Sequence, residues 1–126
     1  MSLEKGVRKG VNMKKKKLLF VCMANTNRSP TFERYFKEHH KEFEVKSTGI
    51  YYGYPEQLTE KILVWADKVF VMDLSQELFI KNHFLKYLNK VEVIGISDQY
   101  DPDSPELIEL IKYWIEKKKF KGDTNK

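Results

Sequence analysis

Four short runs with the character of β-strands constrain the fold of this chain more than any other feature. They are Lys17 to Cys22, Phe43 to Ser47, Asp67 to Met72 and Val91 to Ile96. Short, nearly continuous apolar runs are typical of strands that are buried on both faces. Alternation of such strands with helices predicts parallel pairing through right-handed crossovers. We therefore expect a single-domain α/β sandwich of three layers, in which a four-stranded parallel sheet carries helices on both faces.

Helical spacing of apolar residues separates and follows these runs. Pro30 lies where a first helical turn begins, and Ser29 is a suitable N-cap for a helix that ends near His40. Thr59 is a suitable cap for a short second helix. The remaining two are predicted from Ser75 to about Tyr87, with Leu78, Phe79 and Leu85 facing inward, and from Pro105 onward, with an apolar stripe of Leu107, Ile108, Ile111, Trp114 and Ile115.

Composition and charge exclude several classes of protein. The 126 residues suit one domain, and 41% hydrophobic with 33% charged residues suits a folded, soluble chain. The net charge of +5 comes largely from lysine clusters at 14–17 and 117–121, and charge runs near chain ends are usually solvated. No run approaches the roughly 18 apolar residues of a membrane span, and no signal peptide is evident. We expect a cytoplasmic protein with neither nucleic-acid nor membrane partners.

The lysine clusters also suggest where the folded domain begins and ends. We interpret residues 1–15 as a basic, flexible leader, in which Met13 is an alternative natural start, and residues 119–126 as a flexible basic tail. Residues 16–118 then form the α/β domain.

The loop after the first strand is the candidate functional site, and it holds the only cysteine of the chain, Cys22. In parallel α/β folds, ligands bind at the carboxyl ends of the strands. A loop between a strand and a helix N-terminus directs backbone N–H groups toward one point, and this positive field favours an anion and a thiolate. Arg28 can bind two phosphate oxygens through its planar guanidinium, Ser29 can donate to the sulfur, and Asn25 tolerates a left-handed backbone. A buried, inert cysteine is the alternative for any lone thiol.

The segment Cys22-Met23-Ala24-Asn25-Thr26-Asn27-Arg28-Ser29-Pro30 resembles the C-x5-R-S loop of the low-molecular-weight protein tyrosine phosphatases. KSTGI and LTEKILVWADKVFVMD are similar to further family segments, and the ending ISDQYDPDSPELIELI is most similar to the short prokaryotic branch of predicted protein tyrosine phosphatases. The resemblance covers about 100 residues, from Lys16 to Ile115. It implies a phosphatase that acts on phosphotyrosine or on similar aryl or small phosphate monoesters, with no metal or other cofactor and with phosphate or sulfate as a ligand of the loop.

The resemblance also implies roles for individual residues. Cys22 corresponds to the nucleophile that forms a phosphocysteine intermediate, and Arg28 to the residue that binds the phosphoryl group. Asp98, in Ile96-Ser97-Asp98-Gln99-Tyr100, corresponds to the general acid, and Asp101 is its rival. The residues expected to bind phosphate or to support the loop are Met23, Ala24, Asn25, Thr26, Asn27, Ser29 and Ser47.

Some features of the sequence depart from the family pattern and leave alternatives open. Asn27 occupies a position where many relatives have a second cysteine, so no disulfide can protect Cys22. The absence of further cysteines also disfavours an arsenate reductase. The motif is similar to that of RNA polymerase C-terminal-domain phosphatases, which act on phosphoserine. A phosphate-binding module or a phosphocarrier without turnover is the other alternative.

Overall fold

The computed structural model describes residues 15–24, 28–51, 57–97 and 99–118. Strands and helices alternate along most of this chain. In order they are β2 (Lys16–Cys22), α2 (Arg28–His39), β3 (Phe43–Gly49), α3 (Glu60–Trp65), β4 (Lys68–Val71), α4 (Leu74–His83), the 3₁₀-helix η1 (Leu85–Lys90), β5 (Val91–Val93) and α5 (Pro105–Lys118).

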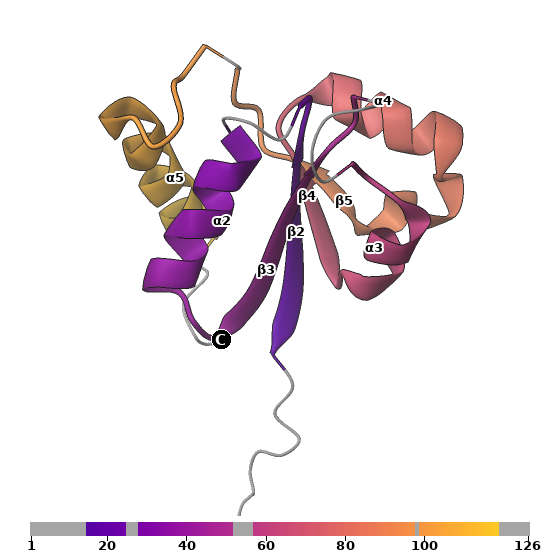
Figure 1. The fold of residues 1–126 in the computed structure, drawn as a ribbon, viewed down its shortest axis with the longest axis horizontal. Coiled ribbons are helices and arrows are strands. Elements are labelled where there is room, and N and C mark those ends of the chain that lie inside the picture. Colours follow the sequence, from indigo (N-terminus) through magenta and orange to yellow (C-terminus); the bar gives the residue numbers. More distant parts are fainter. Residues whose placement is uncertain (1–14, 25–27, 52–56, 98, 119–126) are drawn as a thin grey trace, which may run out of the picture.

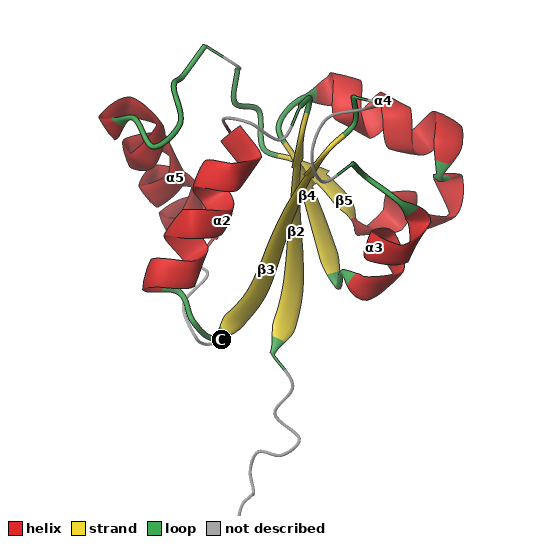
Figure 2. Ribbon diagram, in the orientation of Figure 1, coloured by secondary structure: helices red, strands yellow, loops and turns green. Residues whose placement is uncertain are grey.

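The four described strands form one parallel sheet in the order β3-β2-β4-β5. Helices α2 and α5 lie on one face of the sheet, and α3 and α4 lie on the other (Figures 1 and 2). This arrangement confirms the predicted three-layer α/β fold. Among the described residues, no helix is long and apolar enough to cross a membrane.

Side chains of the central strand β2 alternate between the two faces, as the two-residue period of a strand requires. Leu18, Phe20 and Cys22 pack in the core beneath α2 and α5. Leu19 and Val21 pack in the core beneath α3 and α4. The same period that buries Phe20 therefore directs Cys22 toward the side of the sheet on which α2 begins.

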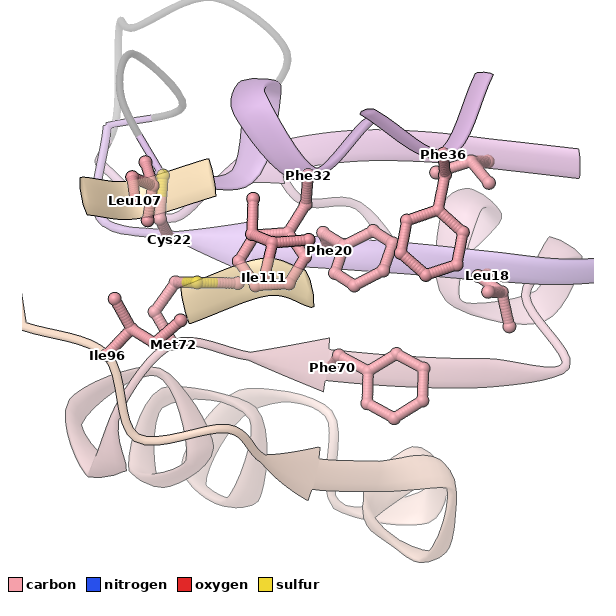
Figure 3. Packing of buried hydrophobic residues seen from close by; sticks show 11 residues of the cluster. Leu18, Phe20, Cys22, Phe32, Phe36, Phe70, Met72, Ile96, Leu107 and Ile111 are labelled. Carbon is pink, nitrogen blue, oxygen red and sulfur yellow. The ribbon is translucent and has the colours of Figure 1, made fainter. Parts of the chain in front are cut away.

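An aromatic cluster holds α2 and α5 against the sheet. Figure 3 shows its phenylalanines, Phe20, Phe32, Phe36 and Phe70. The ring of Phe20 stacks on Phe32 of α2 with centroids 4.8 Å apart and on Phe70 of β4 at 5.5 Å. Trp114 of α5 meets Phe70 edge-on at 4.9 Å. Truncating a buried phenylalanine to alanine typically costs about 3–5 kcal/mol, so this cluster fixes α2 firmly in place.

Helix α2 begins at Arg28, so Pro30 lies in its first turn as predicted, but Ser29 is already inside the helix and is not its N-cap. Ser29 lies in the first turn and its side chain turns toward Cys22. Strand β5 also ends earlier than expected, at Val93. Gly95 has φ +89°, a left-handed conformation that interrupts an extended strand.

The prediction that Leu78 and Leu85 face inward is wrong, because both side chains are more than half exposed. Ile80 is the apolar residue that α4 buries. Helix α4 ends at His83, and the chain continues as the tighter helix η1. A single 3.6-residue period does not extend through both elements, so the inward positions after His83 change.

Candidate active site

Cys22 is the last residue of β2 and is 3% exposed. The hydroxyl of Ser29, in the first turn of α2, donates to its Sγ over 3.0 Å. The same hydroxyl lies 3.3 Å from the carbonyl oxygen of Thr48 on β3. A hydroxyl held in this way supplies a hydrogen bond that stabilises negative charge on the sulfur.

Arg28 is buried, with 2% of the residue exposed, at the point where α2 begins. Its Nη1 donates to Oδ2 of Asp73 over 3.1 Å and to the carbonyl oxygen of Ile96 over 2.6 Å. A buried charge is costly unless it is paired, and these two acceptors satisfy that need. Nη1 makes both of these bonds. The planar guanidinium has further N–H donors on Nε and Nη2, a pair that can bind two oxygens of an oxyanion.

Asp73, which orients Arg28, is itself the N-cap of α4. Its carboxylate accepts from the backbone N–H of Ser75, and Gln76 Oε1 accepts from the Asp73 N–H over 2.8 Å, forming a capping box. Burial raises the pKa of Asp73, but hydrogen bonds from Ser75 and Arg28 and the charge of Arg28 together outweigh it. The pKa therefore lies below its ordinary value, and Asp73 is a carboxylate at neutral pH.

The first residues of the loop are attached to neighbouring elements. The carbonyl oxygen of Met23 accepts backbone N–H groups from Ile50 at 2.7 Å and Tyr51 at 2.9 Å. The Ser75 hydroxyl lies 3.5 Å from Met23 Sδ. These contacts fix the path of the chain as it leaves β2, and Met23 and Ala24 are both half-buried.

The other predicted site residues are only partly described. Asn25, Thr26, Asn27 and Asp98 lie outside the described residues. Ser47, on β3, is 6% exposed and its hydroxyl donates to Glu33 of α2. Asp101 has an exposed side chain, and its carbonyl oxygen accepts from the N–H of Ser104 over 3.2 Å. Asp101 thus contributes a turn before α5 through its backbone.

Sequence reasoning did not assign roles to Asp73 or to the carbonyl of Ile96. Asp73 follows a buried strand, and Gln76 stands three residues later, which is the spacing of a capping box. A capping-box pattern at the carboxyl end of a strand was therefore the sequence signal by which Asp73 could have been found. The Ile96 carbonyl carries no side-chain signature and could not be found from residue types. In the part of the chain that the structure describes, no three His, Cys, Asp or Glu side chains group into a metal site.

The comparisons with solved structures point to one fold. The low-molecular-weight protein tyrosine phosphatase SP-PTP from Streptococcus pyogenes superposes with a TM-score of 0.73 at 19% identity, covering 87% of this chain and 95% of that one. The chain has the low-molecular-weight protein tyrosine phosphatase fold. A phosphatase of this name from T. tengcongensis is 26% identical, with a TM-score of 0.63 and coverage of 82% and 99%. The resemblance drawn from the Cys22 loop is therefore confirmed by the fold.

Phosphatases with different named substrates share this low-molecular-weight phosphatase fold. The YwlE arginine phosphatase from Geobacillus stearothermophilus is 19% identical, with a TM-score of 0.65 and coverage of 89% of this chain and 100% of that one. Wzb structures of the same fold were solved in complex with phosphate and with benzylphosphonate. No protein-family model matches the chain. No curated protein matches it either.

Proposed function

We propose that this protein is a cysteine-dependent phosphatase that hydrolyses phosphate monoesters through a phosphocysteine intermediate. The observation that carries the proposal is the relation of Arg28 to Cys22. A buried guanidinium, fixed through Nη1, stands at the start of the helix whose next residue donates to the thiol sulfur. A structural cysteine needs neither an oriented arginine nor a hydroxyl donor to its sulfur.

In the first step, the Cys22 thiolate attacks phosphorus, the S–P bond forms and the bond to the leaving oxygen breaks. Arg28 and the loop N–H groups stabilise the charge on the phosphoryl oxygens. Asp98 gives its proton to the leaving oxygen. In the second step water attacks phosphorus, Asp98 takes a proton from that water, the S–P bond breaks, and phosphate leaves with the thiolate restored. Ser29 stabilises the thiolate before and after turnover.

The proposed substrates are phosphotyrosine or similar aryl and small phosphate monoesters, with inorganic phosphate or sulfate as a ligand of the loop. The named tyrosine phosphatases and the phosphate complex among the structures of this fold support this class. Phosphoarginine is a second candidate, because the YwlE neighbours of the same fold are named arginine phosphatases. A phosphate-binding module without turnover stays the non-enzymatic alternative.

The test is hydrolysis of p-nitrophenyl phosphate in the presence of a chelator. We expect turnover by the wild-type protein and none by Cys22→Ser, because a hydroxyl does not ionise near neutral pH. Cys22→Ser should still bind phosphate in calorimetry, since Arg28 and the loop are unchanged. Binding without turnover in the wild type would favour the phosphate-binding module, and activity that survives in Cys22→Ser would exclude the proposed mechanism.

A further inference from the structure

The segment between β5 and α5 is attached to helix α2 at two places. At its start, the carbonyl oxygen of Ile96 accepts from Nη1 of Arg28 over 2.6 Å. Near its end, the backbone N–H of Asp103 donates to the hydroxyl of Thr31 over 3.0 Å. The Asp103 carboxylate is held by Arg34, with 3.2 Å from Nε to Oδ1 and 2.7 Å from Nη2 to Oδ2. In Figure 1 the described parts of this segment, on either side of residue 98, lie near the N-terminal end of α2.

The three α2 residues of these contacts, Arg28, Thr31 and Arg34, recur every third residue along the helix. Residues at this spacing lie on one side of a helix. Arg28 is 2% exposed and Thr31 is 0% exposed, whereas the side chain of Arg34 is 53% exposed. One side of α2 therefore carries, in order, the buried Arg28, the buried hydroxyl of Thr31 and the exposed ion pair of Arg34.

Asp103 has φ +58°, a left-handed conformation that is uncommon outside glycine. Aspartate is among the few residues other than glycine that adopt this conformation readily, and the bonds to Thr31 and Arg34 hold it here. The adjoining residues are held as well, since Tyr100 packs against the core beneath α2 and α5. Ser104 accepts the Leu107 N–H at the start of α5. Along the chain, Asp103 therefore lies between the packed ring of Tyr100 and the first turn of α5.

We propose that Asp103 is a positioning residue: its bonds to Thr31 and Arg34 hold the segment that carries the general acid against the helix that begins with the phosphate-binding arginine. This inference rests on the proposed function, in which Asp98 is that acid. A segment fixed at both ends samples fewer conformations than one fixed at a single end, so the acid spends more of its time near the leaving oxygen. Helix α2 then sets the distance between the phosphate-binding Arg28 and the general acid Asp98.

The variants remove these contacts one at a time and are chosen to keep the backbone conformation. Asp103→Asn keeps a residue that tolerates the left-handed conformation and removes the charge together with one of the two oxygens that accept from Arg34. Arg34→Gln removes the other half of the ion pair, and Thr31→Val removes the hydroxyl while keeping the shape. Thr31→Ser keeps the hydroxyl and is the conservative rescue. Lys112→Gln, which breaks the exposed Lys112–Glu109 pair on α5, is the matched control for loss of a surface ion pair.

The catalytic measurement compares phenyl phosphate, which needs a proton donor, with p-nitrophenyl phosphate, which needs one much less. An exposed ion pair contributes little, so Arg34→Gln and Asp103→Asn should each lower kcat for phenyl phosphate only about two- to fivefold. The double variant Thr31→Val with Arg34→Gln should lower it about tenfold or more. KM should not change, p-nitrophenyl phosphate turnover should fall less than twofold, and Thr31→Ser and Lys112→Gln should match the wild type. Equal losses with both substrates, or no loss, would overturn the positioning role.

A second measurement does not depend on activity. Hydrogen exchange of a peptide spanning residues 97–104 should be faster in the double variant than in the wild type, because the Asp103 N–H loses its acceptor. Unchanged exchange would overturn the docking of this segment on α2, whatever the kinetics. If exchange is faster but Asp98→Ala itself shows no dependence on the leaving group, the acid assignment in the proposed function fails while the docking stands.

Discussion

Arg28 and Asp73 are 45 residues apart in the sequence, yet Nη1 of the arginine lies 3.1 Å from Oδ2 of the aspartate. The two residues follow neighbouring parallel strands, β2 and β4, whose carboxyl ends meet at one edge of the sheet. Asp73 is fixed by the capping box of α4, and Arg28 by its place at the start of α2. The ion pair therefore joins two helices on opposite faces of the sheet at the candidate phosphate site.

Asp73→Asn should impair phosphate binding without unfolding α4. Asparagine is as good an N-cap as aspartate, so the helix start is retained. The neutral amide holds the guanidinium less firmly, and we expect kcat/KM for p-nitrophenyl phosphate to fall about tenfold. This is about 1.4 kcal/mol, just below the range for loss of a charge-assisted hydrogen bond, because the amide oxygen can still accept from Arg28. Steady-state kinetics measure this loss. Glu77→Gln removes the same charge within α4 and should be near normal; an equal loss in both variants would attribute the effect to overall charge.

The same ion pair should make stability depend on acid pH. The pKa of Asp73 is lowered from 3.8 in the folded protein, so its contribution is fully present above pH 3.8 and is lost as pH falls through the folded value. The side chain is 40% exposed, and screening limits the contribution to about 1 kcal/mol. Urea unfolding of the wild type and of Asp73→Asn should show a difference at pH 6 that narrows below pH 3.8. A difference in unfolding free energy between the two proteins that widens toward low pH would contradict the predicted direction.

Arg28→Lys should lose activity by a factor of hundreds or more. The guanidinium binds two acceptors through Nη1 and has further N–H donors on Nε and Nη2 with which the proposed mechanism binds phosphate. A lysine ammonium is a single point charge and cannot do both. Kinetics with p-nitrophenyl phosphate and circular dichroism of the same sample separate catalysis from folding. Near-normal activity in Arg28→Lys would mean that this loop does not bind phosphate through the arginine.

The general acid can be identified from its dependence on the leaving group. Asp98→Ala should slow hydrolysis of phenyl phosphate about 100-fold or more, and that of p-nitrophenyl phosphate distinctly less. Asp101→Ala should cost under about tenfold with both substrates, because Asp101 contributes its carbonyl oxygen to a turn. A leaving-group-dependent loss in Asp101→Ala but not in Asp98→Ala would assign the general acid to Asp101 instead of Asp98.

Peroxide should inactivate the protein irreversibly. Cys22 is the only cysteine of the chain, so no intramolecular disulfide can trap its sulfenic acid. Further oxidation then yields sulfinic and sulfonic acids, which thiols do not reduce. Mass spectrometry should find 32 or 48 Da added to the Cys22 peptide, by the oxygen count of these acids. Full recovery with dithiothreitol after prolonged excess peroxide would show that another group protects the sulfur.

The sequence by itself determined the order of the strands and helices along the chain and the position of the Cys22 loop after the first strand. Apolar runs such as Leu18 to Val21 can be satisfied only by burial on both faces, and a proline or a capping threonine marks a helix start locally. These signals act between residues that are close in the chain. The failure at Leu85 also has a local cause, because the change from α- to 3₁₀-helix after His83 shifted the inward positions.

Only the tertiary structure decided which distant groups meet Arg28 and Asp103. The partner of Arg28 is set by the parallel register of β2 with β4, and its second acceptor, the Ile96 carbonyl, is a backbone atom common to every residue. The ion pair of Asp103 with Arg34 depends on how α5 and α2 pack on one face of the sheet. Residue types record which groups can form such bonds, whereas the distances between them arise from packing of the whole core.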